Sequence, residues 1–396
     1  MPIRRSPFSV GLALCTLIAL HAPSPLAAGD PFPAVTRDTP HCLAAIPFEM
    51  VGNLVFFQVR VNGSRPLSFL LDSGANACVI DVGRARELHI PFGKKVQGKG
   101  AGLGTYDVWL IDKDKARFEL PRLNLFADLV ATFDLSSNLP VLGHAVDGII
   151  GYDLMHQYVT EVDYDAQVVR LFDPRSYVHT GAGDSLHLTF ENRVPHVVGH
   201  IEVPGQPAAD RTLLVDTGSQ DAVDDSLIAR SAEVRQVLSG VGNGKEFHGV
   251  DGRVAHFKIG GFALNDFVGG GSGVPLIGGE IWRRFTIVFD YPHERMFIDP
   301  NRHLREPVSE DRSGLVLRWN AEKGVFVVHD LSPGSPAAEA GLEREDTVTA
   351  IDGCPAREYR LDRVERLLNE DGKSLTLTVR RHGRDADVKL TMRRLY

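Results

Sequence analysis

Residues 67–75, LSFLLDSGA, and residues 212–219, TLLVDTGS, decide the fold of this 396-residue chain. Each stretch is an apolar run that ends in Asp, followed by Ser or Thr and then by Gly. Such a run predicts a buried strand, and the glycine allows the chain to turn tightly where the strand ends. A buried carboxylate is costly unless it is paired or hydrogen-bonded, so Asp72 and Asp216 are the first candidate functional residues.

The two stretches belong to a longer internal repeat. Downstream of them, residues 149–151 (IIG) and 276–278 (LIG) are each followed, after the same interval, by Asp-Tyr and by an apolar segment that closes with Asp-Pro. The shared spacing and shared punctuation predict a duplication, with copies at about 45–176 and 186–302. Each copy is expected to consist mostly of short strands, with one short helix after the glycine of each tripeptide.

The duplication gives the two Asp residues a chemical role. If a pseudo-two-fold axis relates the copies, the two loops meet on it, and two carboxylates in contact share one proton. The ionised partner can then take a proton from a water, and the protonated partner can donate one to a substrate carbonyl. A lone Asp of this kind would more often cap its own turn. The residues expected to support the two loops are Ser73, Gly74, Thr217 and Gly218.

The motifs resemble those of aspartic peptidases, and most closely the bacterial retropepsin-like group with two lobes in one chain. The resemblance covers about residues 45–302. The sequences that carry it are residues 72–75 with 149–151, and residues 216–219 with 276–278.

The resemblance implies a mainly β fold with two duplicated retropepsin-like or pepsin-like β-barrel lobes, and it implies that Asp72 and Asp216 are the catalytic pair. It also implies hairpin flaps over the cleft. The candidate flaps are residues 98–107, which include Tyr106, and residues 240–252.

The C-terminal part predicts a separate small domain. Residues 303–312 are polar and are interpreted as a linker to residues 313–396. The sequences SPGSPAA at 332–338 and IDG at 351–353 resemble those of a bacterial PDZ domain, a small α/β fold. The resemblance implies that strand addition holds a peptide C-terminus there, and the residues that would bind it are Gly314, Leu315, Val316 and Leu317.

The N-terminus has the pattern of a secretory signal peptide. Arg4 and Arg5 precede an apolar run at 8–20, and small residues follow at 27–28. The run is shorter than the roughly 20 residues of a membrane span, so none is predicted for the mature form. The predicted organisation is a signal at 1–28, lobes at 29–180 and 181–302, a linker at 303–312 and a PDZ domain at 313–396.

Charge and cysteine content restrict the function classes further. The net charge of −8 argues against a nucleic-acid partner. The histidines lack the close paired spacing of a zinc site, so neither a metal nor another cofactor is predicted. Cys42, Cys78 and Cys354 would remain after signal removal, and the sequence leaves open whether Cys42 and Cys78 form a disulfide.

These observations favour an exported aspartic endopeptidase that acts on peptide or protein substrates, with the PDZ domain recruiting a substrate or partner. The periplasm is the favoured compartment, and secretion is the second choice. The alternative is a non-catalytic periplasmic peptide-binding or scaffold protein with a protease-like fold. A further arrangement, in which each copy pairs with another chain, is less simple because both copies carry an Asp.

Overall fold

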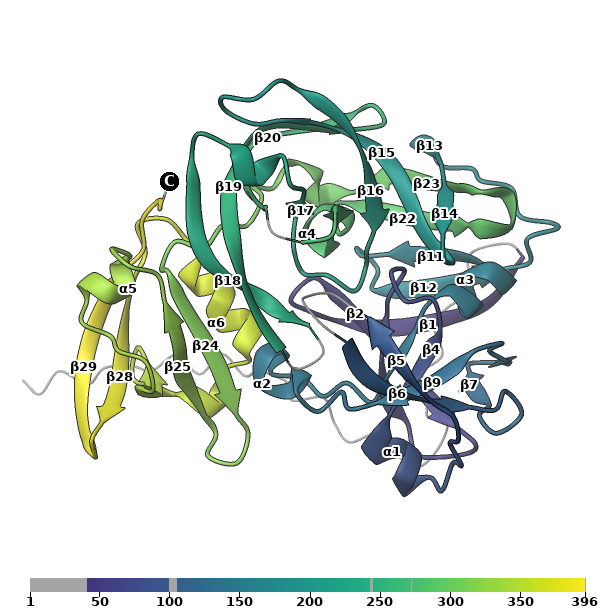
Figure 1. The fold of residues 1–396 in the computed structure, drawn as a ribbon, viewed down its shortest axis with the longest axis horizontal. Coiled ribbons are helices and arrows are strands. Elements are labelled where there is room, and N and C mark those ends of the chain that lie inside the picture. Colours follow the sequence, from purple (N-terminus) through teal and green to yellow (C-terminus); the bar gives the residue numbers. More distant parts are fainter. Residues whose placement is uncertain (1–40, 100–104, 243–244, 272, 396) are drawn as a thin grey trace, which may run out of the picture.

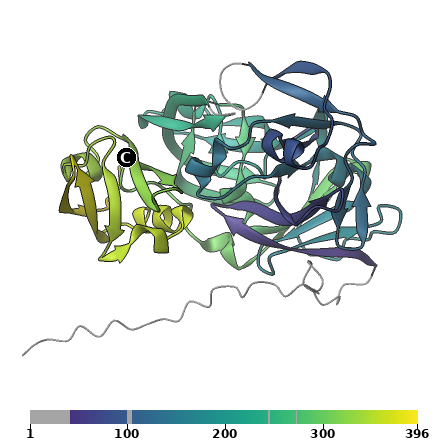
Figure 2. The same cartoon turned by 90° about the horizontal axis from the view of Figure 1, so that it is seen from below.

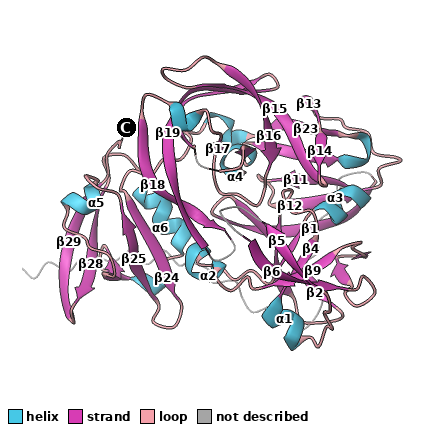
Figure 3. Cartoon of the chain, in the orientation of Figure 1, coloured by secondary structure: helices cyan, strands magenta, loops and turns pink. Residues whose placement is uncertain are grey.

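The computed structural model describes residues 41–99, 105–242, 245–271 and 273–395. The chain is mainly β, as predicted, and its helices are short (Figure 3). The predicted signal segment at 1–28 lies outside the described residues. Within the part of the chain that the structure describes, no helix has both the length and the apolar character needed to cross a membrane.

The part of the chain before residue 176 holds the first Asp loop. Its elements are β1 (Cys42–Val51), β2 (Leu54–Val61), β3 (Leu67–Leu71), β4 (Cys78–Asp81), α1 (Val82–Glu87), β5 (Lys95–Lys99), β6 (Thr105–Ile111), β7 (Phe118–Leu120), β8 (Leu123–Leu125), β9 (Val130–Phe133), α2 (Asn138–Leu142), β10 (Gly148–Ile150), α3 (Tyr152–Gln157), β11 (Val159–Asp163) and β12 (Val168–Phe172).

The following part holds the second Asp loop. Its elements are β13 (Asp184–His187), β14 (Thr189–Glu191), β15 (Val194–Glu202), β16 (Ala209–Val215), β17 (Val223–Asp224), η1 (Ile228–Arg230), β18 (Val234–Gly242), β19 (Lys245–Ile259), β20 (Phe262–Gly270), β21 (Leu276–Ile277), α4 (Gly279–Trp282), β22 (Phe285–Asp290), η2 (Tyr291–His293), β23 (Arg295–Pro300) and η3 (Arg302–Arg305).

The strands around the two Asp loops pair in the same order. In the first part the order is β2-β3-β10-β4, and in the second it is β15-β16-β21-β17. The short strands β10 and β21 lie parallel to the strands that lead into each Asp, and antiparallel to the strands that follow. A short helix follows each tripeptide glycine, as predicted, and these helices are α3 and α4.

A sheet that both parts share joins them beneath the loops. Its order is β13-β23-β22-β11-β12-β1, and the pair that links the two parts is β11 with β22 (Figure 1). A single hydrophobic cluster of buried side chains extends through both parts. Burial of this shared apolar surface stabilises the two parts together, because each covers the other's apolar side chains.

The C-terminal part is a six-stranded sheet with its own hydrophobic cluster. It lies at one side of the molecule (Figure 2). One face of the helix at 361–368 is buried in its core, with Leu361, Val364 and Leu368. Its elements are β24 (Leu315–Asn320), β25 (Val325–Leu331), α5 (Pro336–Glu339), β26 (Thr347–Ile351), β27 (Cys354–Pro355), η4 (Ala356–Glu358), α6 (Leu361–Leu368), β28 (Ser374–Arg381) and β29 (Arg384–Thr391).

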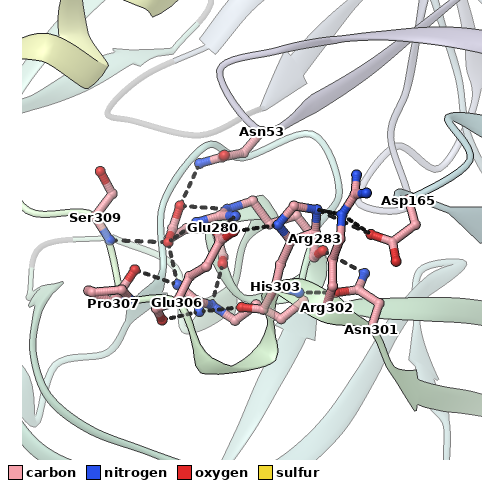
Figure 4. A network of polar contacts seen from close by, with 11 residues as sticks. Asn53, Asp165, Glu280, Arg283, Asn301, Arg302, His303, Glu306, Pro307 and Ser309 are labelled. Atoms are coloured by element: carbon pink, nitrogen blue, oxygen red, sulfur yellow. Dashed lines mark hydrogen bonds and ion pairs between the residues drawn. The ribbon is translucent and has the colours of Figure 1, made fainter.

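The segment predicted as a linker is held firmly by a polar network (Figure 4). The fully buried Arg284 side chain donates to the carbonyl oxygens of His303 at 3.1 Å, Glu306 at 2.6 Å and Pro307 at 3.0 Å. It also pairs with the Glu280 carboxylate at 2.6 Å. A buried guanidinium is tolerated because its donors are satisfied.

The same network reaches the first part of the chain. Glu280 accepts a hydrogen bond at 3.0 Å from the Asn53 side chain, which also donates to the Gln220 carbonyl at 3.2 Å. Glu280 lies in the first turn of α4, and its carboxylate links this helix to the first part of the chain. The β1–β2 turn, the second Asp loop and the segment before the C-terminal domain are therefore connected.

Candidate active site

Both candidate Asp residues lie where a buried strand ends, as the sequence predicts. The Asp72 amide donates to the Ile150 carbonyl at 2.9 Å, and the Asp216 amide donates to the Ile277 carbonyl at 3.0 Å. The tripeptide strands therefore hold the backbone of each loop. These matching contacts bring the two Asp residues to one place.

The two carboxyl groups lie close together across the two loops, and each perturbs the pKa of the other. Each carboxyl group also accepts from the glycine amide of its own loop. Gly74 N lies 2.8 Å from Asp72 Oδ1, and Gly218 N lies 2.8 Å from Asp216 Oδ1. These amide bonds orient the side chains, so the pair is fixed in place before a substrate arrives.

Ser73 and Thr217 lock the two loops together, as predicted. The Ser73 amide donates to Thr217 Oγ1 at 3.0 Å, and the Thr217 amide donates to Ser73 Oγ at 3.0 Å. The hydroxyls in turn donate across the interface, from Ser73 to the Val215 carbonyl at 2.6 Å and from Thr217 to the Leu71 carbonyl at 3.0 Å. Both side chains are completely buried, so no water can replace these bonds.

The close approach of the two carboxyl groups changes their protonation. Burial raises the pKa of Asp72, while the hydrogen bonds from Gly74 and Asp216 act in the opposite direction. Burial raises the pKa of Asp216 well above its ordinary value, and the negative charge of Asp72 raises it further. The two carboxyl groups therefore titrate as a coupled pair, which keeps a proton to a higher pH than a free carboxyl group does.

These shifts predict how stability depends on pH. A carboxyl group with a raised folded-state pKa holds its proton longer in the folded state than in the unfolded state. Its contribution to the free energy of unfolding therefore declines as the pH rises from about 4 towards the raised value. We expect Asp216→Asn to remove this decline, so that its stability relative to wild type is greater at pH 7 than at pH 4.

Denaturant unfolding at several pH values checks this expectation. Asp114→Asn is a suitable control because Asp114 is exposed and its pKa is lowered by Lys115. A constant difference in unfolding free energy between Asp216→Asn and wild type across this pH range would contradict the raised pKa of Asp216.

A tyrosine that the sequence did not single out lies near the pair. The Tyr291 hydroxyl is buried and has no hydrogen-bond partner among the described residues. Burial raises its pKa, and the negative charge of Asp72 adds to the rise. The sequence feature that could have indicated Tyr291 is the Asp-Tyr pair found at the matching interval in both copies. In the sequence analysis this pair was evidence for the repeat alone.

The described residues of the two candidate flap segments lie on pairs of antiparallel strands. Residues 98–107 belong to the β5–β6 pair, and residues 240–252 to the β18–β19 pair. Residues 100–104 and 243–244 lie outside the described residues. Tyr106 packs edge-to-face against Phe133, with ring centroids 4.9 Å apart. A flap role for Tyr106 remains a prediction.

The predicted peptide-binding residues of the C-terminal domain lie at the start of β24, an edge strand. Gly314 has a φ of +68°, and Leu315 and Leu317 point into the core, with exposed fractions of 7% and 4%. Val316 is half-buried. The edge position permits strand addition, and peptide binding by these residues stays a prediction.

The cysteines are not part of the Asp72–Asp216 site. Cys42, Cys78 and Cys354 form no disulfide in the described structure. Burial raises the pKa of the Cys78 thiol, which lies beside the Asp153 carboxyl group. Among the described residues, no group of three or more His, Cys, Asp or Glu side chains is arranged to hold a metal ion.

Comparison with protein families agrees with this geometry. Residues 57–154, which include the first Asp loop, match the family model of aspartyl proteases. Residues 327–381 match the family model of PDZ domains. The chain contains an aspartyl protease domain and a PDZ domain. The second Asp loop lies outside the residues matched by the protease model.

The individual relatives match only short regions of this chain. A carboxyl-terminal-processing protease of Picosynechococcus is 33% identical over 97 residues, which are 24% of this chain and 23% of that protein. A probable CtpA-like serine protease of Staphylococcus haemolyticus is 28% identical over 98 residues, 24% of this chain and 20% of that protein. The chain thus matches less than a quarter of either relative's length.

Among solved structures, a PDZ domain protein from Parabacteroides distasonis is similar to part of this chain. It is 27% identical in sequence, and the match covers 21% of this chain and 20% of that chain, with a TM-score of 0.19.

Proposed function

We propose that the chain is an aspartic endopeptidase that hydrolyses peptide bonds with a water activated by Asp72 and Asp216. The observation that carries the proposal is the close pair of carboxyl groups, each at the end of a matching strand and each acting on the pKa of the other. A buried, proton-sharing pair is the arrangement that general acid–base catalysis requires at mild pH.

In the proposed reaction, ionised Asp72 takes a proton from a water as the water oxygen attacks the substrate carbonyl carbon. Protonated Asp216 gives its proton to the carbonyl oxygen, which forms a neutral tetrahedral diol. One diol proton then passes to Asp216, which is now ionised, and Asp72 gives its proton to the amide nitrogen. The C–N bond then breaks. The products are a carboxylic acid and an amine, without a covalent enzyme intermediate.

The domain organisation that we propose follows from the repeat. The first lobe would extend over residues 29–180 and the second over residues 181–302, each a retropepsin-like unit that contributes one Asp. The matching strand orders around the two loops and the reciprocal Ser73 and Thr217 bonds support this organisation. An Asp in each lobe makes a complete pair within one chain.

Peptide cleavage tests the proposed function. The chain without residues 1–28 is incubated with a diverse peptide library from pH 3 to 8, and the products are identified by mass spectrometry. We expect internal cleavage with a bell-shaped pH profile, because activity requires one proton on the pair. Activity should persist after treatment with a serine-reactive fluorophosphonate, and inactivation by that reagent would contradict the aspartic mechanism.

The same experiment distinguishes the proposed endopeptidase from the main alternative, which is a non-catalytic peptide-binding or scaffold protein. Peptides retained by the folded protein, with no cleavage at any pH, would favour the alternative. Cleavage would exclude it. The assay therefore decides between an enzyme and a binding protein with a protease-like fold.

The space around the two loop glycines differs, so replacement by alanine is expected to have different effects on activity at Gly218 and at Gly74. A Cβ atom at Gly218 would lie 2.4 Å from Asp72 Cγ, whereas one at Gly74 would lie 3.2 Å from Asp216 Cγ. Gly218→Ala must therefore displace the Asp72 carboxyl group. Because a misplacement of about 1 Å can cost about 100-fold in rate, we expect a loss of that size in kcat/KM.

Gly74→Ala is the matched comparison for this effect. We expect a clearly smaller loss in kcat/KM for Gly74→Ala, since its neighbours need to shift by only a few tenths of an ångström. Equal losses in the two variants, measured on the same substrate, would show that the contacts at Gly218 do not control the Asp72 position.

We further propose that the protein is exported and that residues 1–28 are removed. The basic, apolar and small-residue pattern of the N-terminus supports this. Cell fractionation in a Gram-negative host, followed by N-terminal sequencing, provides the test. The expected product begins at Gly29 and is found in the periplasm, whereas a cytoplasmic product that retains Met1 would contradict the proposal.

A further inference from the structure

The peptide-binding edge of the PDZ domain is formed by β24 and the adjacent helix α6. Strand addition requires that an incoming peptide lie along the outer side of β24, next to α6. This edge (β24 with α6) is therefore the surface that must be open for a peptide C-terminus to bind.

The protease domain places its helix α2 against this edge (Figure 1). The helix packs on β24, and its C-terminal residue Gly143 lies at the start of α6. A Cβ atom at Gly143 would be 2.9 Å from the Leu361 Cβ, so the two backbones are in close approach. Because α2 is helical, it covers β24 without pairing with it as a strand.

A charged contact fixes α6 to the same face of the protease domain. Arg360, which precedes α6, forms an ion pair with Glu49 and donates to the Met50 carbonyl at 3.3 Å. Its Nε also donates to the Asp362 carboxylate at 3.0 Å. The end of β1 therefore holds the helix that a bound peptide would have to contact.

The loop before β24 already contains a carboxylate from the chain itself. The Asp311 carboxylate accepts from the Ser313 amide at 2.8 Å, from the Ser313 hydroxyl at 2.8 Å and from the Gly314 amide at 2.9 Å. Successive backbone N–H groups of this kind form an anion-binding loop. One of these donors, the Gly314 amide, belongs to the residues predicted to bind a peptide C-terminus.

The contacts around α2 show which part would have to move. The Leu135 amide, before α2, donates to Asp81 Oδ2 at 2.9 Å, and the His144 ring, after α2, lies 2.9 Å from the Ser68 hydroxyl. Both flanks of α2 are thus attached to the protease domain. The PDZ domain has its own hydrophobic core, so it would move as one unit if it separated from α2.

We propose that the PDZ domain is docked in a self-closed state, in which α2 covers the β24–α6 edge and Asp311 fills the adjoining loop. A peptide C-terminus binds when the PDZ domain separates from α2. The apparent affinity for such a peptide is then the intrinsic affinity reduced by the fraction of open molecules. This inference rests on the PDZ assignment and is independent of catalysis by the Asp pair.

Peptide binding by the full chain without residues 1–28 tests this proposal. The probe is a fluorescein-labelled pool of heptapeptides that end in Ala, Val or Leu with free carboxylates, and the same pool with amidated ends is the control. Glu49→Arg places two positive charges together, and Gly143→Ala forces α2 away from Leu361. We expect each variant to bind the carboxylate pool about five- to tenfold more tightly than the parent chain.

Matched variants separate docking from general destabilisation. Gly63→Ala replaces another glycine of positive φ, but no atom lies within 4 Å of its Cβ position. It should leave the affinity unchanged. Arg360→Glu added to Glu49→Arg restores an opposite-charge pair and should return the affinity to the parent value.

Hydrogen exchange provides a measurement that needs no ligand. Amides of Leu315–Asn320 should exchange faster in Glu49→Arg and Gly143→Ala than in the parent and in Gly63→Ala. Unchanged exchange and unchanged peptide affinity in both variants would overturn the proposal. The absence of carboxylate-dependent binding in the opened variants would overturn it as well. None of these results depends on whether the chain cleaves peptides.

Discussion

Asp72→Asn and Asp216→Asn are each expected to lower kcat by about 10⁴-fold, because general acid and base roles of this pair are both lost when one carboxyl group is replaced. An amide at position 72 cannot take a proton from the water. An amide at position 216 cannot give a proton to the carbonyl oxygen. The measurement is kcat for the preferred peptide from the library, at the pH of maximal activity.

Stability measurements show whether such losses are catalytic. Asn fills the same space and relieves the repulsion between the two half-buried carboxyl groups, so both variants should be at least as stable as wild type near neutral pH. Asp114→Asn, at an exposed site, should keep full activity. Loss of activity in only one of the two active-site variants would indicate that the pair is not formed within one chain.

Thr217→Val is expected to lower the free energy of unfolding by about 2–5 kcal/mol, because buried groups are left without partners. Valine has nearly the same shape but cannot accept from the Ser73 amide or donate to the Leu71 carbonyl. Both groups lie where water does not reach. Denaturant unfolding measures the change, and activity should fall together with stability, since the loops no longer hold each other.

The conservative variant Thr217→Ser keeps the hydroxyl and isolates its contribution. It should retain most of the stability and the activity of wild type. Ser73→Ala should cost a similar amount to Thr217→Val, and the double variant should cost less than the sum, because the two hydroxyls serve one network. Simple additivity would contradict the reciprocal bonding seen in the structure.

The sequence predicted the central features of the site because they are repeated and local. An apolar strand that ends in Asp, and a second apolar tripeptide at a matching interval, define which strand lies beside each Asp. The structure has these contacts, from Ile150 to Asp72 and from Ile277 to Asp216. The mainly β class, the two short helices and the strand hairpins follow from the same periodicity.

The polar contacts between segments that are distant in the sequence could not be predicted from it. Arg284 and Glu280 appear as ordinary charged residues, and their burial depends on carbonyl groups about twenty residues away. Asn53 contacts them from another part of the chain. Hydrophobic periodicity describes which side of an element is buried, but it contains no information about which polar groups meet there.

The packing of α2 on the β24–α6 edge could not be predicted from the sequence for a similar reason. Helix α2 is a five-residue element whose half-buried side chains give no amphipathic pattern. Asp311 lies in a polar segment that was interpreted as a linker, yet its carboxylate is bound by the loop of the next domain. Short elements and polar segments can be assigned only when their partners are visible.

The pairing of β11 with β22 has a consequence for synthesis on the ribosome. Strand β11 is complete at residue 163, whereas its partner β22 begins at residue 285. Until the later residues emerge, the nascent chain presents an open strand edge that can pair with other chains. Any condition that slows translation between these points should therefore increase aggregation of the new chain, even though the finished protein has no such exposed edge at β11.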